Sequence, residues 1–238
     1  KKLLDRIKND NLIIDYAMRY GDPSIKGKIH KLHKAGCEKL VVLPLYPQYA
    51  AATTATVCDE VYRVLMGMRW QPSLQIIPHY ESEPLYIKAL VNSLRSKITE
   101  IKWKPDLVLA SYHGIPQKYF DKGDPYQCYC QKTSRLISEN FKDISLITTF
   151  QSRFGPQAWL QPYTDKTLES LPKEGKKNVL VICPGFSSDC VETLEEISIQ
   201  GRESFLASGG ENFDMVPCLN DNDDHINLLE HLTRKAIQ

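Results

Sequence analysis

LVLASYHGIP, residues 107–116, joins a run of apolar residues directly to a histidine, a glycine and a proline. The apolar residues 107–110 are typical of a buried β-strand, and Gly114 and Pro116 indicate where that strand ends. In open sheets of parallel strands, ligands bind beyond the carboxyl ends of the strands. His113 lies at such an end, where an imidazole that titrates near neutral pH can act as an acid or a base. The alternative is a histidine whose ring only hydrogen-bonds a neighbouring carbonyl group.

Apolar runs of strand length recur along the chain and alternate with stretches whose apolar residues have helical spacing. The runs are residues 12–18, 39–45, 74–80, 106–112, 145–150, 178–184 and 213–219. This alternation predicts an α/β fold with two Rossmann-like domains, each a parallel sheet flanked by helices. The runs are apolar on both sides, as expected for strands that helices cover on both faces. Side chains just after each run, among them residues 151–154 and 186–196, are expected to face one cleft between the domains.

The connector EIKWKPD, residues 100–106, follows a long helical pattern and precedes four further strand-like runs. It predicts a boundary between an N-terminal domain of residues 1–102 and a C-terminal domain of residues 103–238, each within the usual size range of domains. The last predicted helix, at the C-terminal end of the chain, could pack back on the first domain. GCEKLVVLPLYPQY and GKKNVLVICPGFSSD share a glycine, an apolar strand, a proline and a following aromatic residue, which either duplication or chance would explain.

The charges of the chain are balanced, with 30 Lys and Arg against 29 Asp and Glu and a net charge of +1. No overall field attracts nucleic acid, so a nucleic-acid partner is not expected. Residues 40–58 are uncharged, but Pro44, Pro47 and Gln48 interrupt the run, which argues against a membrane-spanning helix. Seven scattered cysteines, and the lack of a signal peptide in KKLLDRIKND, predict a cytoplasmic protein without a targeting segment.

Three common catalytic or nucleotide-binding motifs are absent from the sequence. They are the phosphate loop G-x-x-x-x-G-K-[ST], G-x-G-x-x-G after a strand, and the nucleophile elbow G-x-S-x-G. Their absence argues against nucleotide-dependent enzymes and the common serine hydrolases.

SSDCVETLEEI, residues 187–197, places several carboxylates at the start of a predicted helix. If Asp189 is the N-cap, then Asp189, Glu192 and Glu196 lie on one helix face at spacings of three and four. Such like charges repel one another unless a cation, a proton or solvent lies between them. The stretch therefore predicts a cation or proton site, and its alternative is a solvated acidic face that the helix dipole favours.

Aromatic residues occur near the predicted strand ends. They are Tyr20, Tyr46, Tyr49, Tyr112, Trp159, Tyr163 and Phe186. Such rings would suit a large planar apolar ligand, with Arg19 and Arg153 available to bind its carboxylates. The alternative is that the rings belong to the hydrophobic core.

Five longer stretches make the sequence recognisable as a whole. They are YAMRYGDPSI, LPLYPQYAAATT, SYHGIPQKYFDKGDPY, TFQSRFGPQAWLQPYTD and CPGFSSDCVETLEEI, and the likeness covers nearly all 238 residues. In this order they resemble the ferrochelatase family, whose members insert ferrous iron into protoporphyrin to make haem. The resemblance implies a chelatase-like fold, a lyase of haem biosynthesis, protoporphyrin IX and Fe²⁺ as substrates, and no required cofactor.

Matched residue by residue, the resemblance implies that His113 and Glu192 are catalytic. The expected metal-handling residues are His113, Glu192, Glu196 and Asp189. The expected porphyrin-binding residues are Arg19, Tyr20, Tyr46, Tyr112, Trp159 and Phe186. In this hypothesis His113 accepts a pyrrole proton while Glu192, backed by the other two acids, handles metal delivery or proton exit. Cys190 departs from the many family members that have a second histidine there, although bacterial members resembling this chain also carry cysteine.

Some members of the family hold a [2Fe-2S] cluster on four cysteines. The animal-type ligand within YPQYAAATT is alanine here, and the tail TRKAIQ lacks the remaining ligands, so a cluster is not expected. A different arrangement around Cys128 and Cys130 is the alternative. Much of the family's first βα portion has no counterpart before Lys1, which leaves open whether this chain alone has full activity.

The resemblance also bears on location and on rival functions. Because substrate and product are both apolar, a cleft in peripheral contact with the inner membrane would help their transfer. One rival is a chelatase of the same fold acting on a more polar tetrapyrrole, although the many aromatic residues favour protoporphyrin. The other is a non-catalytic carrier of haem or metal, which needs no base paired with a row of carboxylates. No oligomeric state is predicted.

Overall fold

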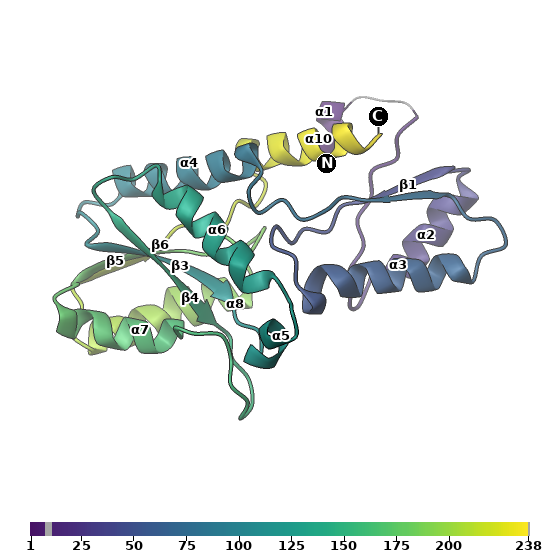
Figure 1. The fold of residues 1–238 in the computed structure, drawn as a ribbon. Coiled ribbons are helices and arrows are strands. Elements are labelled where there is room, and N and C mark those ends of the chain that lie inside the picture. Colours follow the sequence, from purple (N-terminus) through teal and green to yellow (C-terminus); the bar gives the residue numbers. More distant parts are fainter. Residues whose placement is uncertain (8–10, 238) are drawn as a thin grey trace. The chain divides into compact units, whose positions relative to one another are not determined.

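The computed structural model describes residues 1–7 and 11–237, and the chain forms two compact units (Figure 1). The first unit comprises Lys1–His79 and Ile226–Gln238, and the second comprises Tyr80–His225. Each unit has its own parallel sheet and its own hydrophobic core.

The division falls before helix α4 (Pro84–Glu100), whereas the connector at residues 100–106 suggested a boundary after it. Helix α4 belongs to the second unit because it is bound there through its apolar face and through a buried tyrosine. The hydroxyl of Tyr86 donates a hydrogen bond to the carbonyl oxygen of Pro184. A long-range contact of this kind leaves no mark in the local sequence pattern.

The first unit is a small parallel sheet with helices. Its elements are α1 (Lys2–Ile7), α2 (Ile25–Lys34), β1 (Lys39–Val42), the π-helical turn η1 (Ala51–Ala55), α3 (Thr56–Met66), β2 (Ser73–Ile76) and α10 (Asp223–Ile237), which joins this unit from Ile226. Strands β1 and β2 pair in parallel from Lys39 opposite Ser73 to Val42 opposite Ile76. Ile29 of α2, Leu40 of β1 and Val61 of α3 are part of one buried cluster, so both helices pack on the sheet.

The apolar run at residues 12–18 does not form the predicted strand. A single bridge between Met18 and Ser24 is its sheet-like pairing among the described residues. Ile13 is 51% exposed and Tyr16 is 69% exposed, so neither side chain is packed as in a buried strand. Without a hydrogen-bonded neighbour, apolar composition alone does not make a strand.

The second unit contains a four-stranded parallel sheet in the order β4-β3-β5-β6 (Figure 1). Its strands are β3 (Leu107–His113), β4 (Ser145–Gln151), β5 (Asn178–Ile182) and β6 (Asn212–Met215). Its helices are α4, α5 (Gln117–Asp121), α6 (Tyr126–Ser138), α7 (Thr164–Ser170), the 3₁₀ turn η2 (Leu171–Glu174), α8 (Val191–Leu194), the π-helical turn η3 (Glu196–Gly201) and α9 (Arg202–Ala207). Leu107 of β3 lies opposite both Ser145 of β4 and Val179 of β5, so β3 is an interior strand.

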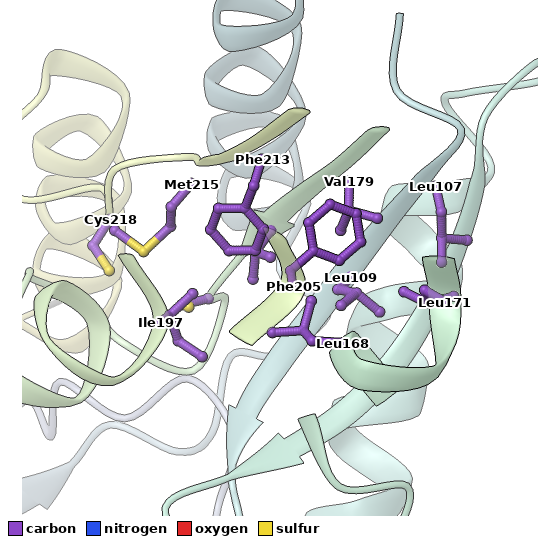
Figure 2. Packing of buried hydrophobic residues seen from close by; sticks show 12 residues of the cluster. Leu107, Leu109, Leu168, Leu171, Val179, Ile197, Phe205, Phe213, Met215 and Cys218 are labelled. Carbon is purple, nitrogen blue, oxygen red and sulfur yellow. The ribbon is translucent and has the colours of Figure 1, made fainter. Parts of the chain in front are cut away.

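Strand β3 directs alternate side chains to opposite faces of this sheet. Leu107 and Leu109 pack into a buried cluster with Leu168 of α7 and Phe205 of α9 (Figure 2). On the other face, the hydroxyl of Tyr112 lies 3.0 Å from the hydroxyl of Ser134 in α6. Helices thus cover both faces, as predicted. His113, one residue after Tyr112, belongs to the face of Leu107 and Leu109.

Candidate active site

The imidazole of His113 is half-buried at the carboxyl end of β3. Its Nδ1 atom lies 2.6 Å from the carbonyl oxygen of Gly114. Because a carbonyl oxygen only accepts hydrogen bonds, Nδ1 carries the proton of the neutral ring and Nε2 keeps its lone pair. The contact with the Gly114 carbonyl oxygen leaves Nε2 able to accept a proton, so the acid–base role of His113 stays a prediction compatible with this geometry.

Gly114 is required at this point for close packing. Its N–H donates to the carbonyl oxygen of Gln151 at 2.7 Å. A Cβ atom on Gly114 would lie 3.0 Å from that oxygen and 3.2 Å from Cε3 of Trp159. Trp159 is 9% exposed, and its indole N–H donates to the carbonyl oxygen of Phe154 at 2.9 Å. The tryptophan therefore packs against the backbone that carries His113.

Glu192 provides a half-buried carboxylate in the first turn of α8. Hydrogen bonds from the Cys190 thiol and from the Glu192 backbone N–H lower the pKa of Glu192, and the positive charge of His113, when its ring is protonated, lowers the pKa further. Burial opposes these effects and raises the pKa of the Cys190 thiol. Glu192 is thus an anion at neutral pH within electrostatic range of His113.

Asp189 is not the N-cap of α8, because Cys190 occupies that position. Its carboxylate instead binds a second loop, accepting hydrogen bonds from the Cys218 N–H at 3.1 Å and the Asn220 side-chain amide at 2.7 Å. The Asp189 N–H in turn donates to Oδ1 of Asn220 at 2.9 Å. Burial raises the pKa of Asp189, but the hydrogen bonds from Asn220 and Cys218 outweigh it, so the pKa is lowered. These contacts give Asp189 a structural role, and its expected metal-handling role stays a prediction.

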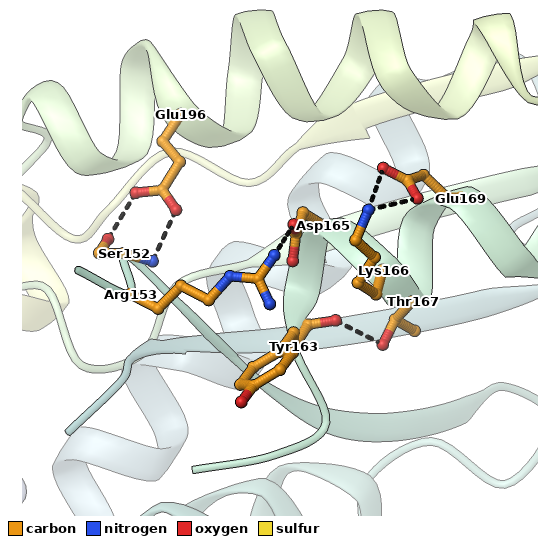
Figure 3. Close-up of polar contacts among 8 residues, drawn as sticks. All are labelled: Ser152, Arg153, Tyr163, Asp165, Lys166, Thr167, Glu169 and Glu196. Carbon is orange, nitrogen blue, oxygen red and sulfur yellow. Dashed lines mark hydrogen bonds and ion pairs between the residues drawn. The ribbon is translucent and has the colours of Figure 1, made fainter. Parts of the chain in front are cut away.

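Glu196 begins the π-helical turn η3, in which the Gln200 N–H donates to the Glu195 carbonyl oxygen at 2.9 Å. Its carboxylate accepts hydrogen bonds from the N–H of Ser152 at 2.6 Å and from the Ser152 hydroxyl (Figure 3). The Gln151 side-chain amide lies 3.4 Å from the same carboxylate. Gln151 and Ser152 had no predicted role, and their position after the strand at residues 145–150 was the signal that pointed to them.

The expected metal-handling side chains do not form a closed cluster. Within residues 1–7 and 11–237, no group of three or more His, Cys, Asp or Glu side chains has an arrangement that could hold a metal ion. His113 and Glu192 are both connected to Gln151, Glu196 is held by the end of β4, and Asp189 is bound to the loop at residues 218–220.

Three of the expected porphyrin-binding residues lie together in the first unit. The guanidinium carbon of Arg19 is 4.5 Å from the ring centre of Tyr20, and Arg19 Nε donates to the carbonyl oxygen of Thr56 at 2.8 Å. Burial raises the pKa of Tyr46, and the neighbouring hydroxyl of Tyr20 raises it further. Tyr20 is 72% exposed, so its ring is accessible from solvent.

The other expected ligand residues differ in exposure. Tyr112 is fully buried against Phe150 and α6, which does not fit a contact with a ligand. Phe186 is partly buried and packs against the hydrophobic core of the second unit. Arg153, considered as a partner for carboxylates, pairs with Asp165 at 2.6 Å in this structure (Figure 3).

Known proteins of similar sequence identify the family. The ferrochelatase family model matches residues 1–237. A ferrochelatase of Allorhizobium ampelinum is 55% identical over 230 residues, which cover 96% of this chain and 67% of that protein. The chain belongs to the ferrochelatase family. A ferrochelatase of Rhizobium meliloti is also 55% identical, over 229 residues that cover 95% of this chain and 68% of that protein.

A solved structure shares the fold of this ferrochelatase-family chain. SirB from Bacillus subtilis, solved with Fe³⁺, matches with a TM-score of 0.74 and 13% sequence identity, covering 99% of this chain and 86% of that one. At this identity the likeness concerns the fold alone. It confirms the predicted chelatase-like α/β architecture with parallel sheets flanked by helices.

The cysteine pair considered for an iron–sulfur cluster is divided by its helix. Cys128 and Cys130 both lie in α6, where two residues span about 200° around the helix axis. Cys128 is exposed and Cys130 is fully buried, so the two thiols face different surroundings. Burial also raises the pKa of the Cys130 thiol well above its ordinary value. This geometry does not favour a cluster built on the pair.

Replacing Gly114 with alanine is expected to destabilise the second unit. The added Cβ would press on the Gln151 carbonyl oxygen and the Trp159 ring, and such overpacking typically costs about 1–3 kcal/mol of unfolding free energy. Urea denaturation followed by tryptophan fluorescence measures the change. Gly67→Ala is the control, because its Cβ would make an ordinary 3.5 Å contact. Equal effects of the two substitutions would contradict the close packing at Gly114.

Replacing Asp189 with asparagine is expected to weaken folding in a pH-dependent way. The folded-state pKa of Asp189 is lowered from 3.8, so its ionised form stabilises the fold at pH values above 3.8. That contribution is lost as the pH falls through the folded-state pKa. The stability difference between the wild type and Asp189→Asn should thus be full between about pH 5 and 7 and shrink below pH 3.8. Asp143→Asn, at an exposed position, should show no such difference in urea denaturation across this range.

Proposed function

We propose that this chain inserts Fe²⁺ into protoporphyrin IX to form protohaem, in the final steps of haem biosynthesis. The observation that carries the proposal is the position of His113, whose Nε2 has a free lone pair, opposite Gln151 in the sheet, because the Gln151 side-chain amide in turn donates to the Glu192 carbonyl oxygen. Membership of the ferrochelatase family supports the same conclusion.

The reaction needs a base and a cation site close together. Two pyrrole N–H protons leave the macrocycle as one divalent cation enters, so the charge of the macrocycle complex stays balanced. Nε2 of His113 accepts one of these protons, the other passes to water, and the anionic Glu192 stabilises the imidazolium that forms. The same carboxylate attracts the incoming Fe²⁺, because hard cations prefer oxygen ligands.

Protoporphyrin recognition is proposed for the aromatic and basic residues expected from the sequence. Arg19 can bind a propionate of the porphyrin, since its guanidinium presents several donors in a plane. The exposed ring of Tyr20 and the half-buried ring of Tyr46 offer apolar surface to the macrocycle. Trp159 supports His113 from behind, as its contact with Gly114 indicates.

No resident cofactor is part of the proposed reaction, because Fe²⁺ is a substrate and the proton transfer needs no redox step. We also propose that the protein acts in the cytoplasm, with peripheral contact at the inner membrane for the transfer of apolar porphyrins. Across the helices that the structure describes, none is long and apolar enough to cross a bilayer.

A single assay tests the function. The protein is mixed with protoporphyrin IX and Fe²⁺ or Zn²⁺, and the absorbance and fluorescence of the porphyrin are followed over time. Catalytic conversion over many turnovers supports a chelatase, and binding that stops at one porphyrin per chain would instead indicate a carrier. A more polar tetrapyrrole assayed in parallel distinguishes the related chelatase activity.

His113→Ala is expected to lower the rate of metal insertion by about 10²- to 10⁴-fold, the usual contribution of a general base. Porphyrin binding, measured by fluorescence titration, should remain. His30→Ala, at an exposed helical position, is the matched control and should keep the wild-type rate. Near-normal turnover of the His113 variant would exclude it as the proton acceptor.

Glu192→Gln is expected to lower the rate of metal insertion by at least about tenfold, because the amide keeps the size of the side chain but lacks its charge. Circular dichroism should show an intact fold. Glu195→Gln, at the exposed neighbouring carboxylate, is the matched control. An unfolded Glu192→Gln variant would point to a structural role for this carboxylate.

A further inference from the structure

The side-chain amide of Gln151 connects the end of the sheet to the helix that carries the acidic residues. Gln151 is 3% exposed. Its Oε1 accepts a hydrogen bond from the Ser111 hydroxyl at 2.7 Å, and its Nε2 donates to the Glu192 carbonyl oxygen at 2.6 Å. Nε2 also lies 3.4 Å from the Glu196 carboxylate. A buried amide with partners on both of its ends cannot shift without leaving a polar group unsatisfied.

Ser152 adds a second connection to the same helix. Its φ angle is +60°, a left-handed conformation that a residue with a side chain seldom adopts. In that conformation its N–H and its hydroxyl both donate to the Glu196 carboxylate (Figure 3). Strained backbone of this kind persists where the surroundings hold it, and here a carboxylate does so.

The connection reaches the proposed base through the sheet. His113 of β3 lies opposite Gln151 of β4 in the parallel ladder, and the Gly114 N–H donates to the Gln151 carbonyl oxygen. Main-chain contacts of Gln151 thus support the histidine while its side chain holds the backbone of Glu192. Because both contacts originate from one residue, the spacing between His113 and Glu192 depends on it.

The contacts also distinguish Glu196 from Glu192. A carboxylate has about four sites for hydrogen bonds, and three donors from Gln151 and Ser152 already point at Glu196. Glu192 accepts hydrogen bonds from the Cys190 thiol and from its own backbone N–H, one fewer than Glu196. Most hydrogen-bonding sites of the Glu196 carboxylate are therefore occupied, whereas the Glu192 carboxylate has more sites available for a cation.

We propose that Gln151 and Ser152 are positioning residues for metal entry. They hold Glu196 and the main chain of Glu192 so that the Glu192 carboxylate stays within range of His113. The proposal rests on the proposed metal-insertion function and names two residues through which that site is assembled. Neither residue is proposed to touch the reacting atoms.

The test uses substitutions that remove one connection at a time. Ser152→Ala removes the hydroxyl, and Ser152→Gly removes it while favouring the left-handed backbone, so the second variant keeps the test valid if the first does not fold. Gln151→Met removes the amide at similar volume. Matched controls are Ser170→Ala, whose hydroxyl donates to the Thr167 carbonyl oxygen, and Gln71→Met, whose amide donates to the Leu65 carbonyl oxygen.

The measurements separate positioning from general stability. Zn²⁺ affinity is determined by calorimetry without porphyrin, KM for Zn²⁺ and for protoporphyrin from insertion kinetics, and folding from thermal denaturation. The Ser152 and Gln151 variants should weaken Zn²⁺ binding and raise KM for Zn²⁺ by about 10- to 100-fold, as for groups that orient metal-binding side chains. KM for protoporphyrin should change much less.

A double-mutant cycle with Glu196→Gln tests whether Ser152 acts through that carboxylate. The expected result is strong non-additivity, with Ser152→Gly adding little to the effect of Glu196→Gln. Additive effects, or Zn²⁺ affinities equal to those of the controls in folded variants, would overturn the proposal while leaving insertion by the wild type intact. Absence of insertion by the wild type would overturn the proposed function and this proposal together.

Discussion

The buried amide of Gln151 is the interaction on which the candidate site depends. It lies at the carboxyl end of β4, beside His113 in the sheet, and it binds the main chain of Glu192 at the start of α8. An amide removed from water must keep its hydrogen bonds, because an unsatisfied polar group in the interior is costly. Gln151 therefore connects to both residues, to the His113 strand through its main chain and to Glu192 through a side chain that has little freedom to move. Placing a site on such regular elements keeps its geometry more constant than a site made of loops alone.

The tautomer of the neutral His113 ring follows from the main chain around it. The carbonyl oxygen of Gly114 selects the tautomer, and the absence of a side chain on Gly114 allows the Gln151 carbonyl oxygen and Trp159 to pack closely. Strand alternation then assigns neighbouring residues to different surroundings. Tyr112 is fully buried under α6, while His113 reaches the end of the sheet near Glu192. One strand thus supplies both a core residue and a reactive residue from adjacent positions.

Three acidic residues within a short stretch have three different roles in the structure. Asp189 binds the loop that contains Cys218 and Asn220, Glu192 stays ionised near His113, and Glu196 is held by Ser152. Repulsion among them is reduced because two of the three charges are satisfied by hydrogen-bond donors. Of the three carboxylates, Glu192 therefore has the most oxygen lone pairs available to bind a cation. This suits a site that must release its cation to a substrate.

The sequence by itself determined the α/β class, six of the strands and the family. Those features depend on apolar periodicity and on short motifs, which are local properties of the chain. It did not determine that residues 12–18 lack a strand neighbour, that α4 belongs to the second unit, or that Tyr112 is buried. The sequence also did not reveal the separate roles of the acidic residues, because Asp189 and Glu196 are distinguished only by their hydrogen-bond partners. Those partners, Asn220 and Ser152, lie 31 and 44 positions away along the chain, and only tertiary folding brings them within hydrogen-bonding distance.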